Sequence, residues 1–458
     1  MYTNTQYNTL LVFHSGLGVL FFIFRPLAVV YGLLILVIGV FWIFRNQNKN
    51  EEALLVAAYL MGAEVFLRMT KGTLNHEFVK YSIMLILLLG MYLKGFSKNA
   101  VPYLVFFILL LPGIVIGMLT INQEERFRQI LMFNLSGPFC LIIASIYCYN
   151  RKITFKKLMD VLLFAGLPII GCATYLVLYT PDLKEVLVNT GSNFDTSGGF
   201  GPNQVATILG FGLFAFFARA LFSSPTKWQL LINLLIVCFF GYRALLTFSR
   251  GGLLTGLFMV ILLLGIVFFK GNSNAKMKIV LSIGTLISVF IIIWLYTVFL
   301  TGGLIEKRYA NQDAQGREKA SMLSGREEIA LTEIDLFLES PFIGGGVGSG
   351  TVYRKQLFDT SIASHNEVTR MIGEHGMFGI MGLLLLIATP LFLFIDNRNH
   401  FFVLSFLAFW FLTLNHAAMR TAAPSFVYAL CLLKIQMDEN TVVYRKQIVE
   451  TWNKRFNN

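Results

Sequence analysis

One histidine stands where a proton acceptor could act. His365 lies in the run Ser364-His365-Asn366-Glu367, just before a hydrophobic stretch that begins near Gly376. Because a histidine titrates near neutral pH, its imidazole can take a proton from a hydroxyl group. A lone histidine at a membrane boundary is, however, more often structural. His375 and His416 are two further candidates for the same chemistry.

Two arginines flank the junction between two hydrophobic stretches. Arg250 lies in Ser249-Arg250-Gly251-Gly252, and Arg243 lies seven residues earlier, two turns deeper on the same helical face. A guanidinium group binds phosphate oxygens in a planar, bidentate way, and an arginine inside a membrane indicates function by default. This pair therefore suits a diphosphate whose lipid tail stays in the bilayer. Alternatively, Arg250 snorkels to the interface and Arg243 has a buried partner such as Glu64.

A third arginine opens a predicted amphipathic helix. Residues 324–338 alternate apolar and acidic side chains at helical spacing, and Arg326 is near their start. By itself Arg326 reads as a solvated charge. After Pro341 ends the helix, the glycine-rich run of residues 344–350 is either a flexible turn or a backbone that approaches an anion closely. Glu64 and Arg68, four residues apart, are expected to pair within one helix.

The sequence carries no sign of a metal or cofactor site. It has no Asp-rich motif in a predicted external loop, no phosphate-binding loop of the Walker A type and no His-Glu-x-x-His. Its five cysteines lie in apolar stretches without metal-ligand spacing, so we interpret them as buried thiols. We therefore predict chemistry that is independent of metals and cofactors.

The amino-acid composition indicates which kind of fold must position these residues. Of the 458 residues, 56% are hydrophobic and only 14% are charged, against about 25% charged residues in soluble domains. The bilayer must therefore solvate most of the chain. The net charge of +12 would suggest nucleic acid in a soluble protein, but basic cytoplasmic loops explain it in a membrane protein. We expect membrane lipids and no nucleic acid as partners.

We predict an all-α polytopic membrane protein with about 12–14 transmembrane helices. A span needs about 20 mostly apolar residues. The first and last pairs of candidate spans are short enough to merge or to be re-entrant. The candidates are 9–24, 26–44, 53–69, 80–96, 101–121, 129–148, 158–180, 204–222, 229–248, 251–270, 278–300, 376–395, 401–416 and 422–437.

The lysines and arginines of the short loops predict the orientation. They gather after the even-numbered spans, so both termini are expected in the cytoplasm and the odd-numbered loops outside it. No cleavable signal peptide is expected, since residues 1–8 lack a basic region. The predicted parts are a membrane region of about eleven helices, a long external catalytic segment, C-terminal transmembrane helices and a cytoplasmic tail. Their boundaries are 1–300, which includes an external loop at 181–203, then 301–375, 376–437 and 438–458.

Several motifs in the second half resemble the O-antigen ligase family, which shares this region with O-antigen polymerases and bacterial protein O-oligosaccharyltransferases. Ser249-Arg250-Gly251-Gly252 is similar to the Ser-Arg-Gly element of the family, and Ser324-Gly325-Arg326 to its Gly-Arg element. Residues 341–348 resemble its Pro-x-x-Gly-x-Gly turn. His365-Asn366, with Gly376-Met377-Phe378-Gly379 downstream, resembles the ligase signature. Gly201-Pro202-Asn203 resembles a further, Asn-containing element.

The resemblance implies a glycosyltransferase of the GT-C type in the bacterial inner membrane, with a periplasmic active site. The donor would be a glycan on a polyprenyl (undecaprenyl) diphosphate carrier, and the acceptor a saccharide of the lipid A-core type. Arg250 and Arg326 would bind the diphosphate, with Arg243 as a third candidate. His365 would activate the acceptor hydroxyl for an inverting attack. The residues expected to support them are Asn366, Asn203, Ser249, Gly376 and Gly379.

Three other functions stay open. A polymerase that extends the glycan on its lipid carrier uses the same donor and differs only in the acceptor. A polysaccharide transporter or flippase would show inverted repeats and polar residues at mid-membrane, of which the sequence shows few. A structural membrane scaffold would not need basic residues and histidines gathered on one predicted face.

Overall fold

The computed structural model describes most of the chain. The described residues are 2–120, 124–180, 182, 186–270, 273–319, 326–358 and 364–437. The predicted tail at 438–458 lies outside them. Within the described ranges, the side chain of Arg326 is also not described.

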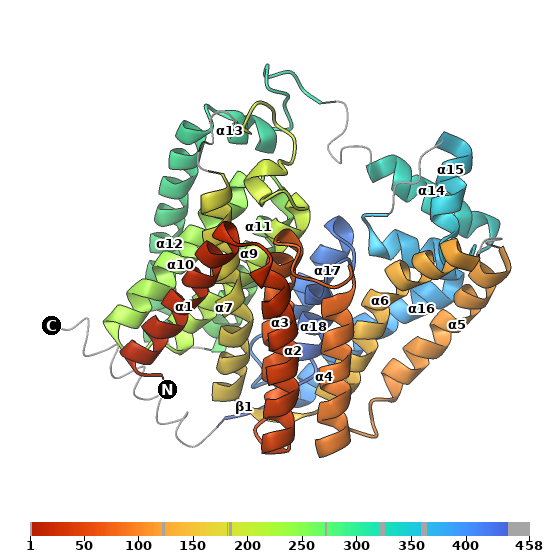
Figure 1. The fold of residues 1–458 in the computed structure, drawn as a ribbon, viewed down its shortest axis with the longest axis horizontal. Helices are drawn as coiled ribbons and strands as arrows, with labels where there is room; N and C mark the ends of the chain where they lie inside the picture. Colours follow the sequence, from red (N-terminus) through yellow and green to blue (C-terminus); the bar gives the residue numbers. More distant parts are fainter. Residues whose placement is uncertain are drawn as a thin grey trace.

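The described chain folds into helices and one small sheet (Figure 1). The first half holds α1 (Asn4–Ile23), α2 (Leu27–Asn46), α3 (Glu52–Met69), α4 (Phe78–Lys94), α5 (Val101–Thr120), α6 (Glu124–Cys148), β1 (Lys152–Thr154), α7 (Phe155–Tyr179), η1 (Asp195–Ser197) and α9 (Pro202–Phe222). The second half holds α10 (Lys227–Leu246), α11 (Arg250–Lys270), α12 (Ser273–Leu300), α13 (Leu304–Tyr309), α14 (Arg326–Glu339), α15 (Ser349–Phe358), α16 (Glu367–Asp396), α17 (Val403–His416), α18 (Ala422–Leu430) and β2 (Lys434–Gln436).

The predicted all-α membrane fold is confirmed. Among the residues searched, nine helices are long and apolar enough to cross a membrane. Each predicted span coincides with a helix, from α1 to α7, from α9 to α12 and from α16 to α18. The amphipathic helix predicted at 324–338 is α14, which ends just before Ser340 and Pro341 as expected. The short helices α13 and α15 were not predicted.

The last two predicted spans are shorter than the sequence indicates. The apolar run at 422–437 forms a helix only as far as Leu430, and α17 has 14 residues. At 1.5 Å per residue α17 is about 21 Å long and α18 about 14 Å, against about 30 Å for the bilayer core. Other segments satisfy the backbone beyond α18. The register of β2 with β1 is parallel, Asn397 donates to the Leu433 carbonyl, and His400 bonds the Leu430 carbonyl.

The loops that the sequence assigns to one side lie at one end of the molecule (Figure 1). Glu51, in the loop after α2, forms ion pairs with Lys94 at 2.7 Å and with Arg151 at 3.1 Å. Lys94 lies at the end of α4 and Arg151 follows α6, so all three residues belong to the side that the sequence assigns to the cytoplasm. Thr226 binds Asn4 near the N-terminus at 2.9 Å. This gathering is the arrangement that alternating spans require. The assignment of this end to the cytoplasm stays a prediction.

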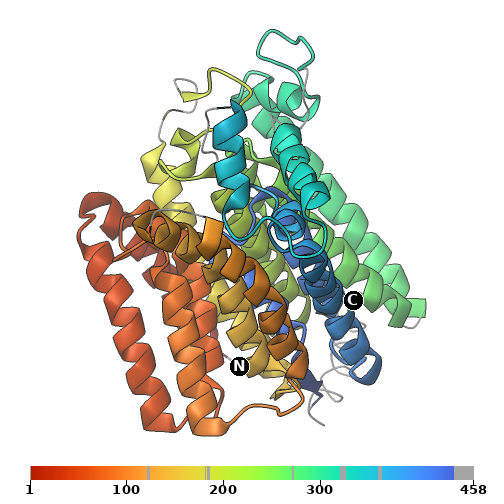
Figure 2. The same cartoon turned by 90° about the vertical axis from the view of Figure 1, so that its right-hand side faces the viewer.

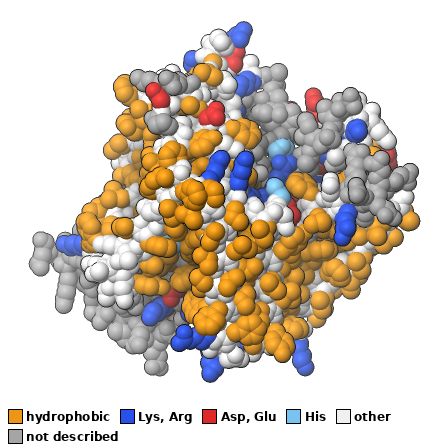
Figure 3. All heavy atoms as spheres, in the orientation of Figure 1, with side chains coloured by type: hydrophobic (Ala, Val, Ile, Leu, Met, Phe, Trp, Pro, Cys, Tyr) orange, Lys and Arg blue, Asp and Glu red, His pale blue; other side chains and the backbone are white. Residues whose placement is uncertain are grey.

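The other end carries the long connecting segments. Helices α13, α14 and α15, together with the described part of 181–203, lie there (Figures 1 and 2). Lys, Arg and His side chains gather toward this end, above a broad hydrophobic surface (Figure 3). The residues that the sequence singles out for the reaction belong to the second half of the chain or to the connecting segments at this end.

Close packing of α9 on α11 determines where α11 begins. A Cβ atom added to Gly252 would lie 2.2 Å from the Ala206 carbonyl carbon, and one added to Gly210 would lie 2.2 Å from the Gly252 oxygen. Gly252 and Gly256 thus form the small-residue spacing that lets two membrane helices touch through their backbones. Arg250, one half-turn before Gly252, is held at the end of this contact.

We expect Gly252→Ala to destabilise the protein, although Gly→Ala in a helix normally stabilises by about 0.5–1 kcal/mol. The added methyl group must push α9 and α11 apart, and such overpacking costs about 1–3 kcal/mol. The measurement is the melting temperature in detergent. Gly265→Ala is the matched control, because Gly265 is on the same helix with open space at its Cβ position. A melting temperature for Gly252→Ala that equals or exceeds that of Gly265→Ala would contradict the expectation.

Candidate active site

The Ser-Arg-Gly-Gly turn joins α10 to α11, and its residues contact different neighbouring segments. Ser249 donates from Oγ to Asn203 Oδ1 at 2.8 Å. Gly251 faces the ring of His416, which a Cβ atom would approach to 2.7 Å. Gly252 makes the contact with α9 described above. Arg250 is the first residue of α11 and is half-buried at the polar end.

Asn203 and His416 join this turn to the end of α17. Asn203 donates from Nδ2 to the His416 carbonyl at 3.4 Å. His416 is held by its ring as well, since Nε2 lies 3.0 Å from Thr207 Oγ1 and Nδ1 lies 2.8 Å from the Leu412 carbonyl. His416 therefore anchors the end of α17 to α9 and α11.

Further cations lie around Arg250. Arg308 on α13 donates from Nε to the Phe248 carbonyl at 3.0 Å, where Phe248 has the unusual φ of 56°. Burial raises the pKa of Tyr309 to about 12, although the charges of Arg250 and Arg308 act to lower it. Burial, followed by repulsion from Arg308 and Arg250, lowers the pKa of Lys319. The charges of Arg308 and Arg250 therefore reach Lys319, where Asp313 opposes them, so positive charge gathers at this place.

The His365 turn is held from two sides. Ser364 Oγ donates to Glu333 Oε2 at 3.2 Å, and the Ser364 carbonyl accepts a hydrogen bond from Arg420 Nη2 at 2.8 Å. Asn366 caps α16, because its Oδ1 accepts from the Val368 amide at 2.9 Å. His365, between Ser364 and Asn366, is half-buried.

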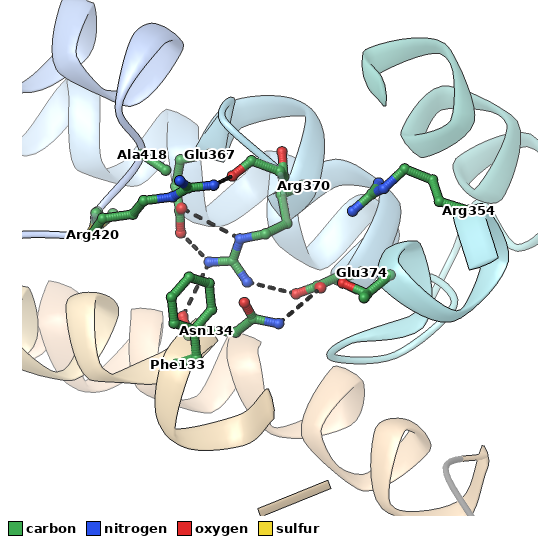
Figure 4. Close-up of a pocket in the computed structure, with 11 residues that line it drawn as sticks. Phe133, Asn134, Arg354, Glu367, Arg370, Glu374, Ala418 and Arg420 are labelled. Carbon is green, nitrogen blue, oxygen red and sulfur yellow. Dashed lines mark hydrogen bonds and ion pairs between the residues drawn. The ribbon is translucent and has the colours of Figure 1, made fainter. Parts of the chain in front are cut away.

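A pocket opens beside this turn, between α6, α15, the start of α16 and the α17–α18 turn (Figure 4). It has about 400 Å³ of empty space and is partly open. Arg370 forms ion pairs with Glu367 and with Glu374, the second at 2.7 Å, and donates to the Asn134 carbonyl at 3.1 Å. The lining residues are Phe133, Asn134, Thr351, Arg354, Ser364, Glu367, Arg370, Glu374, Ala418, Met419 and Arg420.

The glycine-rich turn uses its own amides inside the protein. The amides of Gly345 and Gly346 donate to the carbonyls of Gly373 and Glu374, at 2.9 and 3.0 Å. The Gly348 amide donates at 2.9 Å to Glu374 Oε1, so the anion that this turn binds is the Glu374 carboxylate. The sequence left two alternatives, a flexible turn and a backbone that binds an anion from outside. These bonds fit a turn that binds no external anion. They also anchor the turn, so it is not flexible.

The two downstream glycines bend α16 beneath the His365 turn. Gly376 has φ 58° and ψ −138°, which interrupts the helix, and a Cβ atom there would lie 2.6 Å from the Gly344 amide nitrogen. A Cβ atom at Gly379 would lie 2.1 Å from the Met371 carbonyl oxygen. The predicted start of the span near Gly376 is therefore the position of this kink, and α16 itself begins at Glu367.

Residues 234–387 match the family model described as O-Antigen ligase. This segment, about a third of the chain, is similar to the O-antigen ligase family. The matched residues extend from α10 into α16 and include Arg250, Arg326 and His365. No curated protein matched the chain. The match supports, in general terms, a membrane protein of the type that transfers or joins glycans.

Two of the sequence-predicted arginines differ in setting from Arg250. Arg243 is 3% exposed and donates from Nη2 to the carbonyls of Leu176 and Thr196, at 3.0 and 3.4 Å. Its buried partners are thus carbonyl groups, whereas Glu64 pairs with Arg68 at 2.7 Å as expected. Arg326 is the first residue of α14, and its side chain lies outside the described part of the chain.

The other histidine named as a candidate is buried away from the pocket. His375 is 1% exposed and is packed against Gly113 of α5, where an added Cβ atom would lie 2.3 Å from Nδ1. Neither ring nitrogen has a hydrogen-bond partner among the described residues. His375 lines none of the pocket beside His365.

Sequence reasoning missed Arg420, Arg308 and Glu333. Arg420 carried a usable signal, because it is a charge between the last two apolar runs and therefore near the membrane. Arg308 and Glu333 lie among many other charges in the long connecting segment. Only their contacts with Phe248 and Ser364 distinguish them.

We expect the stability of Glu333→Gln relative to wild type to increase as the pH rises from about 5 to 8. Burial raises the pKa of Glu333, although Thr369, Arg354, Ser364 and Arg370 act to lower it. A carboxyl group with a raised pKa in the folded state loses stability as it ionises, whereas glutamine does not titrate. The other charges nearby are Glu367 and Glu374.

The measurement is the melting temperature of both proteins in detergent across this pH range. If the melting temperature of Glu333→Gln instead falls relative to that of wild type as the pH rises, ionised Glu333 stabilises the fold and the expectation is wrong.

Proposed function

We propose that this protein transfers a glycan from a polyprenyl diphosphate carrier, such as undecaprenyl diphosphate, to an acceptor hydroxyl. The reaction proceeds by direct inversion at the anomeric carbon, without a metal ion. It takes place at the external face of the bacterial inner membrane, at the end of the molecule that carries α13, α14 and α15. The similarity of residues 234–387 to the O-antigen ligase family supports the class of reaction.

The observation that carries the proposal is the convergence of two distant segments on the α17–α18 turn, residues 416–421. Gly251, next to Arg250, contacts the His416 ring at one end of this turn. Arg420, near its other end, donates to the residue before His365. The candidate phosphate-binding residue and the candidate base therefore border the same short stretch of backbone.

The charges on the two sides suit the two partners of such a reaction. Arg250, Arg308 and Lys319 gather positive charge on the α11 and α13 side, where a diphosphate would be bound. Near His365 the arginines Arg354 and Arg370 already face carboxylates. A neutral sugar hydroxyl fits this second environment better than a diphosphate does.

In the proposed reaction His365 accepts the proton of the acceptor hydroxyl as its oxygen attacks the anomeric carbon. The bond from that carbon to the diphosphate oxygen breaks on the opposite face, so the configuration inverts. Negative charge develops on the leaving diphosphate, and Arg250 and Arg326 stabilise it together with Arg308 and Lys319. Arg243 holds the segment before Asn203 in this structure, and its direct role on the diphosphate stays a prediction.

The depth of the site suits a lipid carrier. Helices α17 and α18 are shorter than the bilayer core is thick, so we expect the turn between them to lie below the ends of the longer spans. A polyprenyl chain can then remain in the bilayer while its diphosphate reaches Arg250. The acceptor distinguishes a ligase, which uses a saccharide of the lipid A-core type, from a polymerase, which uses another lipid-linked glycan.

The test measures diphosphate binding and transfer separately. Undecaprenyl diphosphate and undecaprenol are titrated onto the purified protein, because they differ only in the diphosphate. We expect Arg250→Ala to weaken undecaprenyl diphosphate binding by about 10- to 100-fold, the usual value of a charge-assisted hydrogen bond. His365→Ala should bind it within about twofold of wild type but lose transfer by about 100-fold or more in proteoliposomes that contain lipid-linked glycan from the source bacterium.

Arg326→Ala is expected to behave as Arg250→Ala does. Arg45→Ala is the matched control, since Arg45 is exposed at the opposite end of the molecule. If Arg250→Ala binds as tightly as wild type, the diphosphate site is elsewhere. If His365→Ala is folded and transfers normally, His365 is not the base.

A further inference from the structure

We propose that Glu333 is the positioning residue for His365. Its carboxylate holds the two residues on either side of the His365-Asn366 turn in one arrangement, so that the imidazole faces the acceptor. This inference rests on the proposed function, in which His365 is the base, and adds to it the residue that orients the base.

The contacts of Glu333 bracket the turn. Its Oε2 accepts hydrogen bonds from Ser364 Oγ, at 3.2 Å, and from Thr369 Oγ1, at 2.5 Å. Ser364 immediately precedes His365, and Thr369 lies in the first turn of α16 just after it. One carboxylate oxygen therefore joins both ends of the segment that carries the imidazole.

The other oxygen of the carboxylate is fixed by α15. Arg354 Nη1 lies 3.2 Å from Glu333 Oε1, and both side chains are buried, at 3% and 2% exposure. The carboxylate cannot rotate without breaking this ion pair. In addition, Glu333 packs directly on α16, because a Cβ atom at Gly373 would lie 2.6 Å from the Glu333 carbonyl oxygen.

Arg420 completes the arrangement from the opposite side. It donates at 2.8 Å to the Ser364 carbonyl, while Glu333 accepts from the Ser364 hydroxyl. The residue before His365 is therefore held by α14 through its side chain and by the α17–α18 turn through its backbone. Loss of the Glu333 contacts leaves this backbone bond and the local bonds between the Ser364 hydroxyl and the Asn366 backbone, but it removes the link from Ser364 to α14.

Stability does not explain a buried carboxylate here. Burial raises the pKa of Glu333 in spite of two hydroxyl donors and two arginines, so the ionised form is less favourable in the protein than in water. Buried charged groups that do not stabilise a fold are found where function needs them. Its position on α14, seven residues after Arg326, is on the same helical face as that candidate diphosphate ligand.

The first experiment compares Glu333→Gln with wild type in proteoliposomes that contain lipid-linked glycan from the source bacterium. We expect kcat to fall by about 10- to 100-fold, because a base displaced by about 1 Å loses about this much rate. The KM for the lipid-linked donor and the affinity for undecaprenyl diphosphate should stay within about twofold of wild type. Asp335→Asn, an exposed carboxylate on the same helix, is the matched control and should keep the wild-type kcat.

The second experiment separates positioning from packing at Thr369. Thr369→Ser keeps the hydroxyl group and should retain most of the wild-type kcat, whereas Thr369→Val keeps the shape and should lower kcat about 10-fold. Glu333→Gln combined with Thr369→Val should lose no more than the larger single loss, because both changes remove the same contact.

Three outcomes would overturn the proposal. The first is a Glu333→Gln protein with a kcat within twofold of wild type. The second is a rise in the donor KM with kcat unchanged, which would assign Glu333 to donor binding. The third is an active His365→Ala protein, which would show that the proposed base is wrong. The first two leave the proposed function intact, so the two failures are distinguishable.

Discussion

The backbone of a chain inside a bilayer must find all its hydrogen-bond partners within the protein, and this constraint governs the α17–α18 turn. The turn lies between two short helices of 14 and 9 residues, and distant segments bind its polar groups. Glu64 Oε2 accepts from the Ala422 amide at 2.6 Å at the start of α18, and Asn203 donates to the His416 carbonyl at the end of α17. These bonds place Arg420 where it reaches the His365 turn.

The polar end of the molecule separates two electrostatic environments. On the Arg250 side, the charges of Arg308 and Arg250 act to lower the pKa of Lys319, and the charge of Asp313 acts to raise it. Around the pocket, each of Arg354 and Arg370 has at least one carboxylate partner. The proposed reaction would place its anionic donor on the Arg250 side and its neutral acceptor hydroxyl on the pocket side.

The glycines of these motifs allow close packing that positions the candidate residues. Gly252 lets α11 touch α9, and Gly376 bends α16 so that the 344–348 turn can pack against it. The Glu374 carboxylate occupies the Gly348 amide and pairs with Arg370. An anion is indeed bound by the glycine-rich turn, but it belongs to the protein and holds the floor of the pocket together.

Local properties of the sequence were enough to predict the helices and several members of the site. A membrane helix needs a continuous apolar run of about 20 residues, and an amphipathic helix needs apolar side chains that repeat at helical spacing. Both patterns can be read from a short stretch of sequence, so the spans and α14 could be predicted. Arg250, Asn203, Ser249 and His365 were noticed because their immediate neighbours have distinctive types and spacing.

Tertiary structure alone decided where α17 and α18 end, which partners hold Arg243, and that Glu333 and Arg420 bracket His365. These outcomes depend on contacts between residues far apart in the chain. The Ala422 amide and Glu64 are 358 positions apart, and Asn203 and His416 are 213 apart. Hydropathy indicates that residues 422–437 prefer the membrane, but it cannot indicate that other segments satisfy their backbone. A shorter helix is stable only because those partners are present, and no local pattern encodes them.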